Sequence, residues 1–228
     1  MKWLQRLEIN IGANNINKLK KSTVVIIGLG GVGGHALESI VRSGIGNVVI
    51  IDKDVVDITN LNRQLISMHS NIGEYKTDVA KKIILDINPD CNVKCFNIFL
   101  DKSNIDLLFN EKADFIIDAC DKVTTKIEIM KECIKNNIPL ISSMGMGNRL
   151  DPTMIEIIDI KKTSYDPIAK VIRKKIKDYN IKQKITVVCS REKPFKTIDK
   201  IPGSNSLVPS TAGILCASLV INSILKKH

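Results

Sequence analysis

Short apolar runs alternate with segments of helical spacing along the first 150 residues of the chain. The apolar runs are rich in valine and isoleucine, which is typical of strands that are buried on both faces. Between two of them, Val79, Ile83 and Ile87 recur at the spacing of one helix face. The pattern predicts strands at 24–27, 48–51, 93–99, 115–117 and 139–142. It predicts helices at 35–42, 75–87 and 122–135.

Strands that alternate with helices favour an α/β fold with a Rossmann-like, mainly parallel sheet and helices on both faces. After residue 150 the pattern becomes less regular. We predict further strands at 154–158 and 185–188, a basic helix at 168–177, a proline-containing loop at 192–206 and an apolar helix at 210–225. These elements are expected to extend the same sheet in the C-terminal third of the chain.

A glycine-rich turn joins the first predicted strand to the helix after it. Gly28, Gly30 and Gly33 have the spacing G-x-G-x-x-G, and Gly31 is a fourth glycine within it. In this context glycines allow a tight turn and a close approach to phosphate, and the helix N-terminus adds N–H groups and a positive dipole end. Asp52 ends the second predicted strand, where a carboxylate can accept hydrogen bonds from ribose hydroxyls. These features predict a nucleotide site and are common in nicotinamide dehydrogenases.

A polar cluster after Asp52 changes this interpretation, because a dehydrogenase has no need of it. Its amides and its guanidinium suit triphosphate oxygens. Asp121 comes just after the fourth predicted strand, at the edge of the sheet where ligands bind in such folds. One Arg, one Lys and one Asp that converge there suit phosphoryl chemistry, as two charge clamps and a magnesium ligand. The cluster consists of Asp54, Asn60, Asn62, Arg63, Gln64 and Lys76.

The positive charge of the chain is concentrated in one segment. The formal net charge is +10, and residues 161–200 alone hold thirteen Lys or Arg against four Asp or Glu. Such a segment is either a solvated surface or the electrostatic footprint of a polyanion. Composition alone leaves both interpretations open.

The cysteines and the longest apolar run bear on cofactors and compartment. None of the six cysteines forms a C-x-x-C pair, so we expect no zinc site and reduced thiols of a cytoplasmic protein. The apolar run at 214–225 is shorter than the roughly 20 residues that a membrane span needs. We therefore expect a buried helix there and no membrane span, and we find no signal-peptide pattern at the start.

The motifs of the first 150 residues resemble the ThiF/MoeB/HesA, ubiquitin-activating-type adenylyltransferase superfamily. The resemblance implies an enzyme that uses ATP and Mg²⁺ to adenylate a carboxylate. The shared pattern is G-x-G-G-x-G, D-x-D, N-L-x-R-Q, a lysine and D-x-x-D, found here at 28–33, Asp52 and Asp54, 60–64, Lys76, and Asp118 and Asp121.

The same resemblance implies a role for each polar residue. Asp52 would bind ribose, and Asn60, Arg63 and Lys76 would hold the phosphates. Asp121 would bind magnesium and orient the reacting carboxylate. The family also donates an N-terminal arginine across a dimer interface as a charge clamp, so Arg6 is a catalytic candidate beside Arg63, Lys76 and Asp121, and a homodimer is expected. The complete set of implied nucleotide contacts is Gly28, Gly30, Gly31, Gly33, Asp52, Asp54, Asn60, Asn62, Arg63, Gln64, Lys76 and Asp121.

The second half resembles one branch of the superfamily, the tRNA threonylcarbamoyladenosine dehydratases. The matching positions are Asp151-Pro152-Thr153, 159–173, 201–204 and 208–210. The resemblance implies adenylation of the threonyl carboxylate of the modified adenosine beside the anticodon, followed by ring closure within the same side chain and net loss of water. Because an intramolecular attack has a high effective molarity, no enzyme nucleophile is needed. We accordingly interpret Cys189 as a buried thiol.

A tRNA substrate would give the basic segment a function, through contacts to phosphates rather than to bases. On this interpretation residues 1–228 form a single adenylating domain, with a nucleotide-binding core at 1–150 and a substrate-facing extension at 151–228. The candidate tRNA contacts are Lys161, Lys162, Arg173, Lys174, Lys175 and Lys177.

Three alternatives stay open at this stage. An adenylyltransferase that activates the C-terminus of a ubiquitin-like sulfur-carrier protein would share the nucleotide site but bind a small protein. A nicotinamide dehydrogenase would leave Arg63, Lys76 and Asp121 unexplained as a set. A non-catalytic binding module would keep the fold without exchanging pyrophosphate into ATP. A sulfur-transfer partner cannot be identified from the sequence.

Overall fold

The computed structural model describes residues 2–108, 110, 112–196 and 201–226. Its centre is one seven-stranded sheet of order β3-β2-β1-β4-β5-β7-β6. Six strands are parallel, and β6 pairs antiparallel with β7 at one edge. The strands are β1 (Thr23–Ile27), β2 (Asn47–Ile51), β3 (Asn92–Phe96), β4 (Phe115–Asp118), β5 (Leu140–Ser143), β6 (Ile155–Asp159) and β7 (Thr186–Ser190).

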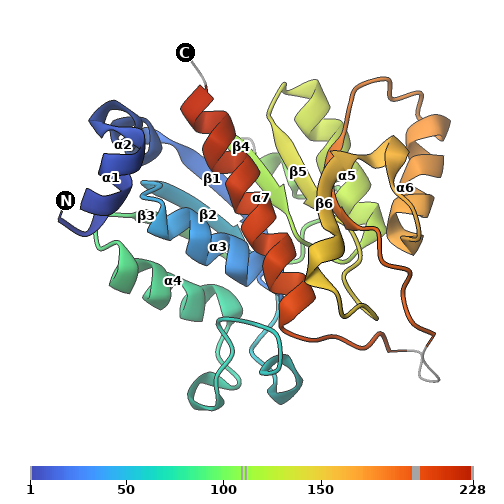
Figure 1. Ribbon diagram of the computed structural model, residues 1–228, viewed down its shortest axis with the longest axis horizontal. Helices are drawn as coiled ribbons and strands as arrows, with labels where there is room; N and C mark the ends of the chain where they lie inside the picture. Colours follow the sequence, from blue (N-terminus) through green and yellow to red (C-terminus); the bar gives the residue numbers. More distant parts are fainter. Residues whose placement is uncertain (1, 109, 111, 197–200, 227–228) are drawn as a thin grey trace.

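Helices cover both faces of this sheet, which confirms the predicted fold class (Figure 1). The α-helices are α1 (Gln5–Ile11), α2 (Ala13–Lys21), α3 (Gly33–Arg42), α4 (Lys76–Ile87), α5 (Val123–Lys135), α6 (Pro167–Asp178) and α7 (Leu207–Lys226). Short 3-10 turns are η1 (Lys2–Leu4), η2 (Ile58–Asn60), η3 (His69–Asn71), η4 (Ile105–Leu108), η5 (Pro152–Met154) and η6 (Ile160–Lys162).

Alternation along β1 divides the core between the two faces. Val24 and Ile26 belong to the cluster under α3, α4 and α7, whereas Val25 and Ile27 belong to the cluster under α5. Successive side chains of a strand point to opposite faces, so an uninterrupted apolar run is what a strand covered on both sides requires. The strand order changes direction at β1, which has β2 on one side and β4 on the other. In parallel α/β sheets, this switch point opens a crevice at the carboxyl ends of the strands.

Two parts of the chain differ from the predicted elements. The hydrophobic pattern does not predict α1 and α2, because α2 buries only Ile16 and Leu19 among polar and basic residues. The strand predicted at 93–99 ends at Phe96, since the next residue, Asn97, accepts a hydrogen bond from the Thr77 hydroxyl of α4 and leaves the sheet. The loop predicted at 192–206 has no regular structure at 192–196 and 201–206, and the remaining residues lie outside the described part.

The apolar helix α7 lies across the sheet and along α3 (Figure 1). Among the described residues it is the one helix long and apolar enough to cross a membrane by length and composition. A core helix of a folded domain satisfies the same criteria, and Ala212, Cys216 and Val220 of α7 are buried in the main core cluster. Its contact with α3 is very close, because a Cβ at Gly213 would lie 2.3 Å from the Val32 carbonyl oxygen.

We predict that Gly213→Ala destabilises the protein by about 2 kcal/mol, because the added methyl group forces α7 away from α3. Helix propensity alone would favour alanine by about 1 kcal/mol, so a loss reverses the usual sign. Urea unfolding measures the change. Ile214→Ala, on the exposed side of the same helix, is the control and should change stability by less than about 0.5 kcal/mol. A Gly213→Ala protein as stable as the parent would contradict the close packing.

Candidate functional site

The turn between β1 and α3 is built from glycines that leave no room for side chains. Gly28 has φ +89°, and a Cβ there would lie 2.8 Å from the Ala119 carbonyl oxygen in the turn after β4. A Cβ at Gly33 would lie 1.7 Å from the carbonyl oxygen of Gly28 itself. Backbone from two neighbouring strands therefore meets in direct contact at the switch point of the sheet.

The N-terminus of α3 opens from this turn and is suited to an anion. Its N-cap residue, Val32, makes no side-chain capping hydrogen bond. The first N–H groups of a helix have no intrahelical partner, and the helix dipole places partial positive charge there. At Gly30, the one atom within 4 Å of an added Cβ would be Nε2 of Gln64, at 4.0 Å. A phosphate group could therefore approach the backbone of the turn closely.

Asp52 connects the glycine turn to the end of β2. Its Oδ2 accepts a hydrogen bond from the Leu29 amide at 2.6 Å, and its Oδ1 accepts one from the Asp54 amide at 2.8 Å. The side chain is half-buried. Each carboxylate oxygen keeps further acceptor capacity, so the same group can accept hydrogen bonds from the hydroxyls of a ligand.

Lys76 is the first residue of α4 and lies beside Asp54. Its side chain is 6% exposed, and its Nζ lies 3.4 Å from Oδ2 of Asp54, whose side chain is 52% exposed. The Lys76 amide also donates to the Asp54 carbonyl oxygen at 3.0 Å. The largely buried ammonium of Lys76 thus faces an exposed carboxylate at the surface of the site.

The turn at 57–64 brings the predicted arginine and amides to the glycine loop. The guanidinium of Arg63 donates to the Thr59 carbonyl oxygen at 2.8 Å and to Oδ1 of Asn62 at 3.0 Å. A Cβ at Gly31 would lie 3.3 Å from the Arg63 carbonyl oxygen and 3.5 Å from its Cγ. Asn60 is buried, where its Oδ1 accepts the Asp57 amide and stabilises the turn. The stem of Arg63 thus packs directly on the glycine turn.

Asp121 is exposed just after β4, above a buried ion pair. Beneath it, Nζ of Lys126 lies 3.0 Å from Oδ2 of Asp118, and their side chains are 1% and 0% exposed. The Ser142 hydroxyl also donates to that oxygen, at 2.6 Å. Burial lowers the pKa of Lys126 and the Asp118 carboxylate raises it, and the pKa lies above its ordinary value. The ammonium is therefore charged at neutral pH and compensates Asp118.

The ring of Phe99 contacts two lysines, Lys53 and Lys122, that are adjacent in sequence to Asp54 and Asp121. The ammonium groups of Lys53 and Lys122 lie over its ring, at 5.7 Å and 4.2 Å from the centroid. Each of these lysines is adjacent in sequence to one of the two predicted aspartates. The carboxyl ends of β2, β1 and β4 thus form one continuous polar edge.

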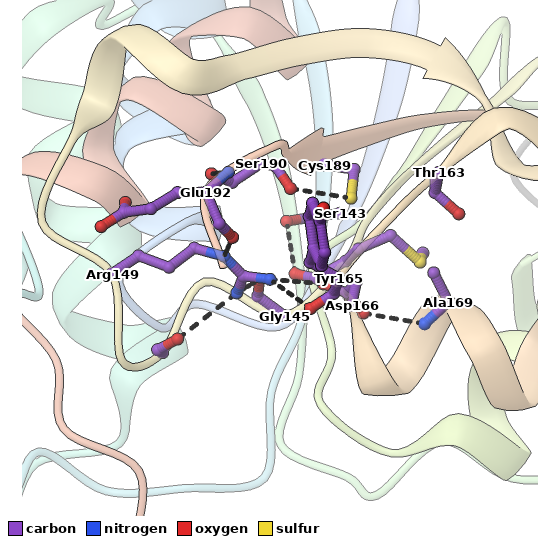
Figure 2. A network of polar contacts seen from close by, with 12 residues as sticks. Ser143, Gly145, Arg149, Thr163, Tyr165, Asp166, Ala169, Cys189, Ser190 and Glu192 are labelled. Carbon is purple, nitrogen blue, oxygen red and sulfur yellow. Dashed lines mark hydrogen bonds and ion pairs between the residues drawn. The ribbon is translucent and has the colours of Figure 1, made fainter. Parts of the chain in front are cut away.

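A second buried network lies beyond β5 (Figure 2). The guanidinium of Arg149 donates to the carbonyl oxygens of Gly145, Gly147 and Glu192, at 3.3 Å for Gly147 and 3.1 Å for Glu192. It lies 3.4 Å from Oδ2 of Asp166, and the two side chains are 1% and 0% exposed. One arginine therefore fixes the loop after β5, the turn after β7 and the start of α6.

The segment before α7 joins this network to the nucleotide side. The Asn205 side chain donates to the Arg149 carbonyl oxygen at 2.6 Å. The Asn62 side chain donates to the Ser204 carbonyl oxygen at 3.0 Å. Residues 201–206 therefore contact both the turn that carries Arg63 and the loop after β5.

Neither Lys126 nor Arg149 was predicted as a site residue. Lys126 shares a helix face with Met130 and Cys133, at i+4 and i+7. This spacing from apolar residues indicates in the sequence that the Lys126 side chain is buried. Arg149 lies in a loop without periodicity, so no pattern in the sequence marks it as buried.

The structure does not bring Arg6 to the site of its own chain. Arg6 is exposed on α1. Leu4, two residues before Arg6, lies against Gly44, the second residue after α3, because a Cβ at Gly44 would be 2.9 Å from its Cδ1. The glycine turn is at the opposite end of α3.

The basic candidates of the second half lie on η6 and α6, on the other side of the sheet from α7 (Figure 1). Arg173 is half-buried and donates to the carbonyl oxygen of Thr163 at 3.0 Å and to its hydroxyl. The others are exposed: Lys161, Lys162, Lys174, Lys175 and Lys177.

The cysteines of the second half are unsuited to nucleophilic chemistry. Cys189 and Cys216 are buried, and burial raises the pKa of each thiol to about 12. The nucleophilic form of cysteine is the thiolate, which is scarce at neutral pH when the pKa is that high.

Among the described residues, no group of three or more His, Cys, Asp or Glu side chains could hold a metal ion. Magnesium in nucleotide enzymes is held by one or two carboxylates together with substrate phosphates and water. A single exposed carboxylate such as Asp121 fits that mode, whereas a site made by protein ligands alone would need more of them.

The chain is similar to known proteins over almost its whole length. The profile of the ThiF family matches residues 4–228. A tRNA threonylcarbamoyladenosine dehydratase of Bacillus subtilis is 42% identical over 97% of this chain and 94% of its own. One of Haemophilus influenzae is 33% identical over 94% of this chain and 90% of its own. The crystal structure of the Escherichia coli tRNA N6-threonylcarbamoyladenosine dehydratase TcdA in complex with ATP superposes with a TM-score of 0.94, at 30% identity, over 99% of this chain and 95% of that one.

We predict that Lys126→Met lowers the free energy of unfolding by about 3–5 kcal/mol, because it leaves the Asp118 carboxylate buried without its partner. Urea unfolding followed by circular dichroism measures the loss. Lys135→Met, on the same helix, removes a surface pair with Glu132 at 3.0 Å and should cost less than about 1 kcal/mol. Equal losses in the two variants would mean that the buried pair contributes no more to the free energy of unfolding than the surface pair.

Proposed function

Because this chain belongs to the ThiF family, we propose that it catalyses the ATP-dependent dehydration of N6-threonylcarbamoyladenosine in tRNA, beside the anticodon. The observation that carries the proposal is the similarity, over nearly the full length of both chains, to dehydratases of that name. The matching fold binds ATP in the E. coli structure. The glycine turn and its polar surroundings in this chain suit the same nucleotide.

The reaction proceeds in two steps. An oxygen of the threonyl carboxylate attacks the α-phosphorus of ATP, so that an acyl-adenylate forms and pyrophosphate leaves. A group of the same threonylcarbamoyl side chain then attacks the activated carbonyl carbon, loses a proton and displaces AMP, which closes a ring. The net change in the nucleoside is the loss of one water. The buried, protonated Cys189 is consistent with a second step that uses no enzyme thiol.

We assign the nucleotide contacts to the polar edge at the carboxyl ends of β1, β2 and β4. The glycine turn at 28–33 and the N-terminus of α3 receive phosphate, and Asp52 accepts hydrogen bonds from the ribose. The positive charges of Arg63 and Lys76 stabilise the negative charge that develops as pyrophosphate leaves. Asn60 holds its turn in place for Arg63, and Gly31, Asp54, Asn62 and Gln64 surround the same ligand.

We assign the magnesium ion of the ATP complex to Asp121. A bound Mg²⁺ would neutralise phosphate charge and so favour attack at the α-phosphorus. Asp121 itself is exposed and free to orient the incoming carboxylate, while the pair of Lys126 and Asp118 fixes the backbone from which it projects.

We propose that Arg6 acts in the site of a second copy of the chain. In its own chain it lies at the far end of α3, so it can reach a glycine turn only across a dimer interface. Ile9 of α1 is 78% exposed and Trp3 is 41% exposed, which are apolar surfaces that such an interface would bury.

The proposal divides the chain by role. Residues 1–150 hold the nucleotide, and residues 151–228 present the basic face of η6 and α6 to tRNA. ATP, tRNA and six free cysteines are all compatible with a cytoplasmic enzyme. Activation of a sulfur-carrier protein is not favoured, because the relatives that match over nearly their full length are named as tRNA dehydratases.

The proposed reaction predicts a specific mass change. Incubation of the protein with ATP, Mg²⁺ and tRNA that carries threonylcarbamoyladenosine should convert that nucleoside to a product lighter by one water. Mass spectrometry of the digested tRNA measures it, and omission of ATP is the control. An unchanged nucleoside, with protein that is folded and binds ATP, would refute the proposal.

The site assignment predicts that Arg63→Ala and Asp121→Ala each lower kcat/KM by about 100-fold or more, because each removes charge that acts on the reacting phosphate. Both side chains are at least partly exposed, so thermal unfolding should change little. Initial rates of AMP formation with tRNA measure the loss.

Cys189→Ala is the matched control for these two variants. It alters a buried thiol of β7 and should keep its turnover within a few-fold of the parent enzyme. A Cys189→Ala enzyme without activity, in a folded preparation, would restore the thiol mechanism and overturn our assignment.

A further inference from the structure

A cavity of about 400 Å³ lies at the end of α6, away from the glycine turn. The C-terminal half of α6, η6 and the turn before β7 form its walls. Its lining consists of Lys161, Arg173, Ile176, Lys177, Asn180, Ile181 and Lys182. Four of these seven residues are cationic, and the described lining contains no carboxylate.

The cavity lies at the opposite edge of the sheet from the nucleotide site. Helix α6 begins beside the loop after β5, where Asp166 pairs with Arg149, and it ends at Asp178, next to the cavity. Its 12 residues span about 18 Å. The wall on the far side is η6, whose Ile160 amide donates to the carbonyl oxygen of Ile185, just before the amino end of β7, at 3.0 Å.

Two of the cations are held in place by the protein itself. The Arg173 guanidinium is fixed by Thr163, and Nζ of Lys161 donates to the Lys182 carbonyl oxygen at 3.4 Å. Lys177 and Lys182 are exposed at the rim. A preset guanidinium with two adaptable ammonium groups suits a phosphodiester, which presents oxygens to several donors at once.

The floor of the cavity is apolar, and one amide completes the wall. Ile176 is buried and Ile181 is half-buried, so the floor can pack against a ribose ring. The side chain of Asn180 can donate to a phosphate oxygen or accept from a 2′-hydroxyl. The RNA backbone presents both a charged phosphate and a sugar ring to this lining. An acidic peptide has no sugar ring beside its carboxylates, so RNA fits the cavity better.

We infer that this cavity binds a backbone phosphodiester of the RNA substrate, at the opposite edge of the sheet from the reacting carboxylate. The inference rests on the proposed function and deepens it, because a ligand that occupies both edges of the sheet at once must be a polymer. A free nucleoside reaches only the carboxyl edge. The cavity therefore selects a threonylcarbamoyladenosine that is part of a tRNA.

The test compares two pairs of lysines. The variant Lys177→Gln/Lys182→Gln removes both adaptable charges from the rim, whereas Lys21→Gln/Lys81→Gln removes two exposed charges from α2 and α4, on the opposite side of the molecule (Figure 1). The net charge of the two variants is identical. The probe is an unmodified tRNA transcript, and its dissociation constant is measured by fluorescence anisotropy at several salt concentrations.

We expect the dissociation constant for tRNA to rise about tenfold at low salt in the rim variant, with a salt dependence that is shallower by about one for each lysine that contacts a phosphate. The control variant should bind like the parent. ATP binding and the thermal midpoint, measured on all three proteins, show that the rim variant is folded.

Unchanged tRNA binding in the rim variant would overturn the inference. Equal weakening of tRNA binding in the control variant would also overturn it, because the loss would then follow from net charge alone. The proposed function fails separately, when the parent enzyme binds tRNA but does not remove water from its threonylcarbamoyladenosine. Displacement of tRNA by polyglutamate of equal charge at equal concentration would point to a generic polyanion surface and would also overturn the inference.

Discussion

The backbone contact between the β1–α3 turn and the β4–α5 turn is the constraint on which the site depends. Gly28 and Gly33 lie so close to Ala119 and to each other that only hydrogen atoms fit between the chains. Because β1 lies between β2 and β4 and is parallel to both, the carboxyl ends of the three strands lie at one edge, and this contact brings the turns after β1 and β4 together there. Asp52 and Asp121 follow β2 and β4 at this edge, although they are 69 positions apart in the sequence, and Lys76 joins them through its pair with Asp54. The open N-terminus of α3 then supplies positive partial charge at the centre of that edge.

Two buried ion pairs hold the loops around this edge. The pair of Lys126 and Asp118 fixes the turn after β4, and the pair of Arg149 and Asp166 fixes the loop after β5 and the start of α6. A buried charge is costly unless its partner and further hydrogen bonds are in place, so each pair tolerates one arrangement of the surrounding backbone. Residues 201–206 contact both sides of the edge, and the loops of the two halves of the chain thereby become one site.

The two edges of the sheet carry different patterns of charged side chains. At the carboxyl edge, cations and carboxylates alternate within a few ångströms, which suits a reaction that transfers charge between phosphate and carboxylate groups. Along η6 and the C-terminal half of α6, cations outnumber carboxylates, which suits the binding of a long polyanion. The two functions need different electrostatic patterns, and the length of α6 separates them.

The sequence by itself determined the fold class, most strand and helix positions and the glycine, Asp52, Arg63 and Lys76 motifs, because these depend on local periodicity and on residue spacing along one chain. It did not predict α1 and α2, whose few apolar residues form no clear pattern, or the end of β3, which a contact with α4 sets. In the sequence, only the helical spacing of Lys126 from Met130 and Cys133 indicates burial, and no pattern marks Arg149. Only the tertiary structure placed their charges in the interior, because burial depends on elements that are distant in the chain. The same reason explains why the sequence showed the positive charge of the basic segment but not the cavity within it. A cavity exists only once η6, α6 and the turn before β7 are packed together.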